Sequence, residues 1–382
     1  MMDLQRLRVT LFIGLAFFGV MLFSAWGKEK SQAIAEQNPI HEASASSIDV
    51  PNEQTSVSDV PMGQVAPMPA IPVATGIITP SDQLVSVRTD ALDIKIDRKG
   101  GDIVYAALLD YPQSQEQGSE PYILLDTSLS RSYVAQSGLI GNHAPDSGPE
   151  GRQLYQTYEV FEETDGSVSV KMHWNHEGEK VRVTKQFHFP SHGYLVDVSY
   201  HVQNNANSVW TASPYFQLKR QPQEKKKSGL IGLPVYQGAA YSTPDKRYQK
   251  VTYDKIKDKP LSLSSEGGWA ALVEHYFLSA WVPKSDQSLK LYTKSDAQNH
   301  FYIGYVAAPI QVAPGAVENI SASLYLGPEV TDELRQIAPG LDLTVDYGVL
   351  WPISQMLFWF LKNFFEMVGN WGWSIILVTL LV

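Results

Sequence analysis

Two uncharged apolar runs, one near each end of the 382-residue sequence, constrain this chain more than any other feature. The first run, Val9 to Trp26, is eighteen residues long. As a helix it would measure about 27 Å, close to the ~30 Å hydrocarbon core of a bilayer. The sequence therefore predicts a transmembrane signal anchor over residues 1–27, with Trp26 as an anchor at the membrane interface. A cleaved signal peptide is the alternative, because Arg6 and Arg8 precede the run; the same arginines favour a cytoplasmic N-terminus.

The second run, Met367 to Val382, has sixteen residues and would reach only about 24 Å as a helix. A chain that stopped there would leave its terminal carboxylate in or near hydrocarbon, which is costly. We therefore expect residues 369–382 to be the start of a second transmembrane helix that continues beyond residue 382. Ser374 and Thr379 in this run either bond back to the preceding helical turn or line a hydrophilic cavity within the membrane.

An amphipathic segment precedes the second run. Apolar residues recur at helical spacing between residues 347 and 366, among them Ile353, Leu357, Phe360 and Phe364, and polar residues including Lys362 and Glu366 take the other side. The pattern predicts a helix that lies in the membrane interface, within a linker-and-helix segment over residues 341–368. A helix packed on a soluble domain is the alternative. Trp351 and Trp371 are the predicted interface anchors here.

The segment from residue 28 to residue 80 is predicted to be a disordered tether. It contains seven prolines and no Phe, Trp or Tyr. Such a composition cannot bury enough apolar surface to order itself.

Residues 81–340 are predicted to form one large β domain. Stretches such as 181–189 and 194–202 alternate apolar and polar residues and are separated by Gly, Pro and Asn, which is typical of antiparallel sheets packed face to face. We expect Gly100-Gly101 to form a hairpin turn, and Glu274 and His275 to lie on opposite faces of a strand over 268–282. One helix is expected near the end of the domain, capped by Thr331.

Composition excludes several classes of function. A net charge of −10 argues against nucleic-acid binding, which needs a basic face. The absence of cysteine excludes disulfides, thiolate metal sites and a Cys nucleophile. No phosphate-binding or dinucleotide motif is present, and the histidines scatter over turns and strands. We therefore predict no catalytic, cofactor-binding or metal-binding residues, and a protein that is not an enzyme.

Two sequence motifs carry a resemblance to a known family. They are LDLTVDYG at residues 341–348 and GNWG at residues 369–372, the latter followed by Ser374-Ile375-Ile376. Together with the order of anchor, tether, β domain and interfacial helix, they resemble the YidC membrane protein insertase family of Gram-negative bacteria, in the type with a large periplasmic domain. The likeness covers the whole chain in architecture and roughly residues 325–382 in motif.

The resemblance implies a mainly β fold, a galactose mutarotase-like supersandwich in the periplasm, flanked by transmembrane helices of a multi-pass inner-membrane protein. It implies insertion and folding of nascent inner-membrane proteins, alone or with the Sec translocon, and contact with lipid and, through the part after residue 382, with the ribosome. Clients would pass through a hydrophilic intramembrane groove that Thr379 helps to line. The family's groove arginine would follow residue 382, so we expect residues 1–382 alone not to insert clients.

The sugar-binding likeness of the sandwich supplies an alternative from another class. A membrane-tethered carbohydrate-binding or mutarotase-like domain could stack sugars on aromatic side chains such as Trp210, Tyr215, Trp269 and Trp281, although core packing also explains these residues.

Overall fold

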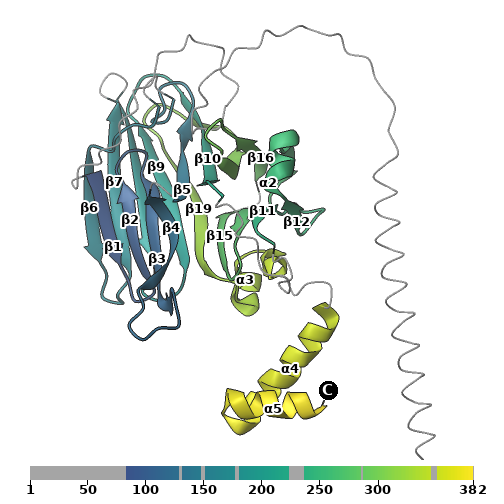
Figure 1. The fold of residues 1–382 in the computed structure, drawn as a ribbon. Helices are drawn as coiled ribbons and strands as arrows, with labels where there is room; N and C mark the ends of the chain where they lie inside the picture. Colours follow the sequence, from purple (N-terminus) through teal and green to yellow (C-terminus); the bar gives the residue numbers. More distant parts are fainter. Residues whose placement is uncertain are drawn as a thin grey trace, which may run out of the picture. The chain divides into compact units, whose positions relative to one another are not determined.

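The computed structural model describes residues 83–128, 131–147, 151–176, 180–222, 236–284, 287–345 and 351–381. The predicted anchor at 1–27 and tether at 28–80 lie outside the described residues. Most of the described chain forms two antiparallel sheets (Figure 1). This confirms the prediction of a mainly β chain with an antiparallel sandwich.

The first sheet has ten strands, and β10 lies near its centre between β5 and β17. In sheet order its strands are β1 (Leu84–Arg88), β2 (Leu92–Asp97), β3 (Asp102–Pro112), β4 (Pro121–Ser128), β5 (Arg131–Ile140), β10 (Trp210–Arg220), β17 (Phe301–Ala307), β16 (Ser288–Ser295) and β13 (Ser262–Glu266), with β18 (Ile310–Val312) paired to β10.

The second sheet has nine strands, and β9 lies between β19 and β8. In order its strands are β12 (Gln249–Val251), β11 (Gly238–Tyr241), β14 (Ala270–Val273), β15 (Phe277–Pro283), β19 (Val317–Pro328), β9 (Leu195–Asn204), β8 (Val181–Phe189), β7 (Val168–His176) and β6 (Thr157–Glu162).

The main core lies between the two sheets and follows from the alternation in sequence. In β9, the second, fourth, sixth, eighth and tenth residues are buried, beginning with Val196 and Val198. The four apolar ones, Val196, Val198, Tyr200 and Val202, join Ile94 of β2 and Phe216 of β10 in one cluster. Because side chains of a strand alternate between faces, the period of two in the sequence selects the face that enters the core.

A smaller core covers the other face of β14 and β15. Leu334 of α3 (Thr331–Ile337) and Leu341 of the 3-10 helix η2 (Leu341–Thr344) are buried there with Trp269. The indole Nε1 of Trp269 donates a hydrogen bond to the carbonyl of Pro339 at 3.0 Å. One further helix of the domain, α2 (Tyr253–Asp258), is capped by Thr252.

Two local predictions are wrong. The N-cap residue of α3 is Val330 and not Thr331, because the carbonyl of Val330 already accepts the helical bond from the backbone N–H of Leu334. Residues 268–282 are not one strand: the backbone N–H of Glu274 bonds to the carbonyl of Phe277 at 2.9 Å and closes a hairpin turn between β14 and β15. The turn predicted at Gly100-Gly101 is confirmed, and both glycines have positive φ.

Two helices follow the sandwich in sequence, α4 (Trp351–Val368) and α5 (Trp371–Leu381). Among the residues that the structure describes, no helix combines the length and the apolar character needed to cross a membrane.

Candidate membrane-contact surface and buried polar clusters

One face of α4 packs and the other is exposed. Leu357, Phe360 and Phe364 are half-buried along one side, and the rings of Phe360 and Phe364 stack with their centroids 6.2 Å apart. Ile353 and Trp351 lie in the first turn of the helix, where the structure describes the backbone only. The periodicity that predicted an amphipathic helix therefore matches the burial of the residues described.

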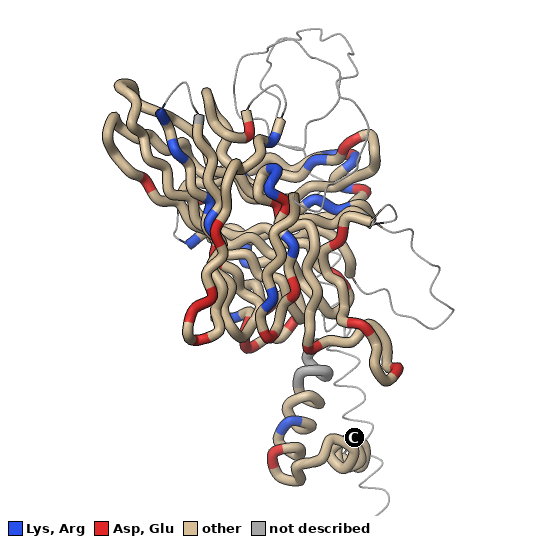
Figure 2. Tube along the Cα trace, turned by 90° about the vertical axis from the view of Figure 1, so that its left-hand side faces the viewer, with Lys and Arg blue, Asp and Glu red and all other residues tan. Residues whose placement is uncertain are grey.

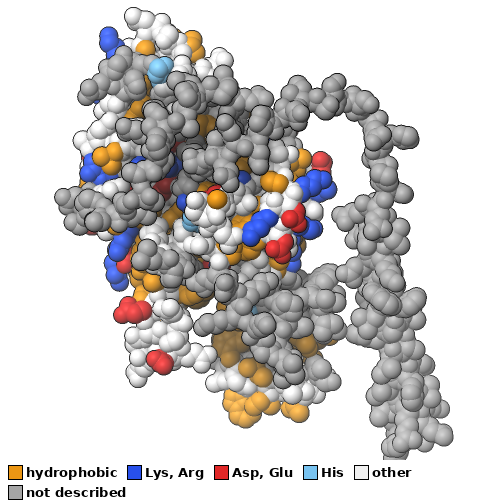
Figure 3. Space-filling model, turned by 45° about the horizontal axis from the view of Figure 1, so that its top comes forward, with side chains coloured by type: hydrophobic (Ala, Val, Ile, Leu, Met, Phe, Trp, Pro, Cys, Tyr) orange, Lys and Arg blue, Asp and Glu red, His pale blue; other side chains and the backbone are white. Residues whose placement is uncertain are grey.

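The exposed side of α4 is also rich in apolar side chains. Met367 is 73% exposed and Trp359 is 59% exposed, close in sequence to the exposed Lys362 and Glu366. Hydrophobic side chains are gathered in the lower part of Figure 3. The exposed large apolar residues of the two helices are Met356, Phe358, Trp359, Met367, Val368, Trp371, Trp373, Ile375, Ile376, Leu380 and Leu381. So many exposed apolar side chains on two consecutive helices are typical of a site that contacts a membrane or another protein.

The junction between α4 and α5 is built by Gly369 and Asn370. Gly369 has φ of 69°, in the left-handed region that favours glycine at the end of a helix. The Oδ1 atom of Asn370 accepts hydrogen bonds from the backbone N–H groups of Gly372 at 2.9 Å and Trp373 at 3.3 Å, which caps α5. The rings of Trp371 and Phe365 stack with their centroids 3.9 Å apart. The predicted anchor Trp371 therefore joins the two helices.

Both hydroxyls of α5 bond to their own helix. Ser374 Oγ donates to the carbonyl of Asn370, and Thr379 Oγ1 donates to the carbonyl of Ile375, each at 2.8 Å. Ser374 is buried, whereas Thr379 is exposed. The hydroxyl proton of Thr379 is therefore satisfied locally, and its oxygen can still accept a hydrogen bond.

Inside the sandwich, four charged side chains that no sequence motif indicated lie together. Asp102 of β3, Asp146, Arg152 and Lys185 of β8 are each at most 9% exposed. Arg152 forms an ion pair with Asp102, and its Nε lies 3.9 Å from Asp146 Oδ1. Two positive and two negative charges thus compensate one another in the core.

The ammonium group of Lys185 ties the two sheets together. Its Nζ donates to the carbonyl oxygens of Gly100 at 3.1 Å, Gly101 at 2.7 Å and Ser137 at 3.0 Å. An added Cβ at Gly101 would lie 2.8 Å from Lys185 Cδ, and one at Gly138 would lie 1.9 Å from the carboxylate of Asp146. The glycines therefore make the space that the charged side chains fill.

Burial dominates the protonation of this cluster. It raises the pKa of Asp102 to about 6 against the opposing effect of Arg152, and it lowers the pKa of Lys185 to about 7 against the opposing effect of Asp102. Burial also raises the pKa of Asp146. The groups are enclosed between the sheets, so the cluster cross-links the fold and offers no access to a substrate.

A second buried ion pair joins the first sheet to the β14–β15 turn. Arg220 Nη2 lies 2.7 Å from Glu274 Oε1, and the hydroxyl of Tyr122 donates to Glu274 Oε2 at 2.6 Å. The guanidinium group of Arg220 also lies 4.9 Å from the ring centroid of Tyr133. Glu274 adjoins His275 in sequence, whereas its structural partner Arg220 is 54 positions away, so the local sequence does not reveal this pair.

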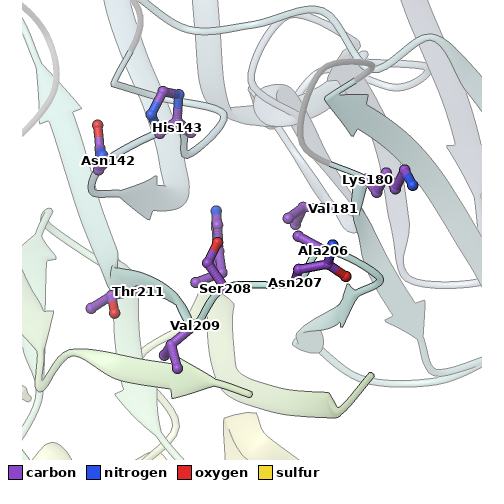
Figure 4. Close-up of a pocket in the computed structure, with 10 residues that line it drawn as sticks. Asn142, His143, Lys180, Val181, Ala206, Asn207, Ser208, Val209 and Thr211 are labelled. Carbon is purple, nitrogen blue, oxygen red and sulfur yellow. The ribbon is translucent and has the colours of Figure 1, made fainter. Parts of the chain in front are cut away.

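A pocket of 520 Å³ lies among loops beside β8 and β10 (Figure 4). Figure 4 shows Asn142 and His143 on one loop and Lys180 on another, with Ser208 and Val209 on a third segment. His143 and Lys180 have positive φ values of 59° and 56°. The polar side chains that line the pocket could hydrogen-bond a small molecule. The charged residues of the pocket, however, are not buried.

The histidines and aromatic residues considered from the sequence have structural partners. His173 bonds to Thr184 and His188 to Ser169 across neighbouring strands. No group of three or more His, Asp or Glu side chains arranged to hold a metal ion is found among the described residues. The four aromatic residues considered as sugar platforms are all at most 5% exposed and belong to the core; they are Trp210, Tyr215, Trp269 and Trp281.

Comparison with known proteins gives matches over the full chain. The family model for the YidC periplasmic domain matches residues 84–360. A protein named membrane protein insertase YidC from Pseudoalteromonas atlantica is 38% identical over 381 residues, covering 99% of this chain and 67% of that protein. Proteins of the same name from Legionella pneumophila strain Paris and from Pseudomonas aeruginosa are 37% and 33% identical, covering all of this chain and 67% and 70% of those proteins. The chain therefore spans about two thirds of the length of these relatives.

The solved structures that match this chain are more distant in sequence. A galactose mutarotase related enzyme from Lactobacillus acidophilus has a TM-score of 0.41 and 10% identity, covering 64% of this chain and 97% of that one. The GH36 alpha-galactosidase AgaB from Geobacillus stearothermophilus has a TM-score of 0.42 and 8% identity, covering 65% of this chain and 40% of that one.

Proposed function

The chain belongs to the YidC family of membrane protein insertases, and from this premise we propose that it takes part in inserting and folding inner-membrane proteins. The relatives that match it over its full length carry the insertase name, and its sandwich matches the family's periplasmic domain. The structural observation that supports the proposal most is the exposed apolar surface of α4 and α5, which suits contact with lipid.

In this proposal the N-terminus is cytoplasmic, the sandwich lies in the periplasm, and α4 lies in the interface of the inner membrane. Trp26, Trp351 and Trp371 act as interface anchors. Nascent inner-membrane proteins are the clients, and the Sec translocon and the ribosome are further partners. No covalent step is part of this function, so the protein is not an enzyme.

Thr379 is proposed to line a hydrophilic groove. Its side chain is exposed on α5, and its oxygen can accept one more hydrogen bond. A polar segment of a client is costly in hydrocarbon, because its hydrogen-bonding groups lose water without gaining partners. A groove that supplies such partners lowers the barrier to moving that segment through the membrane.

The carbohydrate-binding alternative gains no support from the aromatic residues that suggested it. All four are packed in the core, where their ring faces cannot reach a sugar. We therefore propose no sugar-directed function.

A chimera tests the proposed function. Residues 1–382 replace the matching two thirds of the Pseudoalteromonas relative, whose remaining third is kept. We expect the chimera to restore growth and client insertion in cells depleted of their own insertase, and residues 1–382 alone to fail. A chimera that accumulates in the membrane at the relative's level but does not rescue would contradict the proposal.

A further inference from the structure

Strand β6 is an open edge of the nine-stranded sheet. It pairs with β7 on one side, and in the described part of the chain no strand pairs with its other side. All six of its residues are exposed. It is the leftmost strand in Figure 1, and Figure 2 views the sandwich from that side. An unpaired edge presents backbone donors and acceptors to any extended chain.

The register shows which backbone groups face outward. The N–H of Glu163 donates to the carbonyl of Ser167 at 2.8 Å, next to the paired residues Glu162 and Val168. In an antiparallel pair, alternate residues bond to the partner strand. Residues 157, 159 and 161 therefore bond toward β7, and Tyr158, Val160 and Glu162 direct their N–H and C=O groups away from the sheet.

The same residues extend the apolar face of the sheet past the core. Tyr158 and Val160 lie opposite Met172 and Val170 of β7, which are fully buried. Tyr158 and Val160 themselves remain 44% and 43% exposed. The core-facing side of the sheet thus continues onto β6, where the guanidinium group of Arg98 lies 5.6 Å from the ring centroid of Tyr158 and both apolar side chains stay partly exposed. A further strand here would bury apolar area beside both residues.

The other sheet edges differ from β6. Edge strand β1 already buries Val85 and Val87, β12 has three residues, and β13 has a largely serine sequence. Proteins usually protect an open edge with lysine, proline or a bulge. Strand β6 has none of these, and its charged residues are Glu159 and Glu162.

We propose that the outer edge of β6 binds an extended polypeptide segment as an additional antiparallel strand. Side chains of the segment that fall beside Tyr158 and Val160 are apolar, and those that fall beside Glu159 are basic, because a strand alternates between faces. Two copies of β6 would place Glu159 and Glu162 of each copy along one ladder, on its two faces, in a protein of net charge −10, which disfavours self-pairing. The binding goes beyond the proposed insertase function and can be measured without it.

Peptide binding to the full chain in lipid nanodiscs tests the proposal. The probe is a fluorescent peptide of alternating valine and lysine, followed by fluorescence anisotropy. Val160→Pro removes an outward N–H and leaves the bonds to β7 intact, whereas Val160→Thr keeps the N–H. We expect Val160→Pro to weaken binding about tenfold and Val160→Thr to leave it within about twofold. An unchanged melting temperature of both variants verifies the fold.

A charge swap checks the predicted register. A peptide with glutamate in place of lysine should bind the wild-type chain more weakly, and Glu159→Lys should reverse that preference. Equal affinity of both peptides for every variant would overturn the proposal. A second outcome would also overturn the proposal. If Val160→Pro abolished self-association of the chain and left its affinity for the peptide unchanged, the edge would bind a second copy and not a peptide.

Discussion

Lys185 stands at an inward position of β8, between the buried residues Val183 and Phe187. Alternation in sequence assigns this position to the core, so a lysine there indicates a buried partner set. The structure supplies that set as the carboxylates of Asp102 and Asp146 and three backbone carbonyls. Removing one charge from such a cluster lowers the free energy of unfolding by more than the net amount that the whole cluster contributes, because the remaining buried charges are no longer compensated.

The pH dependence of stability tests the environment of Asp102. Its pKa is raised in the folded state, from 3.8 to about 6, so the stability linked to its proton is present below about pH 4 and is lost as pH rises to about 6. In the Asp102→Asn variant the side chain has no carboxyl proton and stays neutral at every pH. We expect the wild-type free energy of unfolding, relative to that of the variant, to fall by about 1–3 kcal/mol between pH 4 and pH 6.

Urea unfolding followed by tryptophan fluorescence measures this difference. The exposed residue Asp245 supplies the control, since Asp245→Asn makes the same chemical change at the surface. Parallel profiles for wild type and Asp102→Asn would show that Asp102 is not buried as described. The pKa of Lys185 is lowered in the folded state, so its effect on stability has the opposite dependence on pH. The stability linked to its neutral amine is present above about pH 10.5 and is lost as pH falls to about 7.

At the scale of elements, the sequence predicted those strands and helices in which one face is apolar and buried and the other is polar. Strands β8 and β9 follow their period of two, and α4 follows its helical period. The break at Gly369 was also predictable, because glycine tolerates the positive φ that ends α4. The cap of α3 was not, because the position of its first turn is fixed by the chain leaving β19 and not by the hydroxyl of Thr331.

The Asn370 cap gives a prediction for α5. Asn370→Ala removes the acceptor for the N–H groups of Gly372 and Trp373, and a lost N-cap costs about 1 kcal/mol. We expect hydrogen exchange in the first turn of α5 to speed up roughly fivefold in the full chain in nanodiscs. Asn370→Asp keeps an acceptor and should exchange at the wild-type rate. Equal exchange in all three proteins would contradict the capping role.

At the scale of the whole molecule, the fold class and the α4 surface were predictable, and the partners that meet in the buried clusters were not. Patterning within one segment identifies strands and amphipathic helices. The pairing of Arg220 with Glu274, by contrast, depends on the two sheets meeting, which no local pattern encodes. The open edge of β6 was missed for a related reason, because a strand becomes an edge only through the order of strands in the sheet.

The proposed function requires above all that α4 lies in the membrane interface while the sandwich stays in water. The chain has no cysteine, so a single introduced cysteine gives a unique site for a nitroxide label. Labels replace Phe358 of α4 and, as a control, Tyr276 in the exposed β14–β15 turn. In nanodiscs, electron paramagnetic resonance should find the label at 358 accessible to oxygen and shielded from a water-soluble nickel complex, and the label at 276 open to nickel. Equal nickel accessibility of the labels at the two positions would contradict the placement of α4 in the membrane interface.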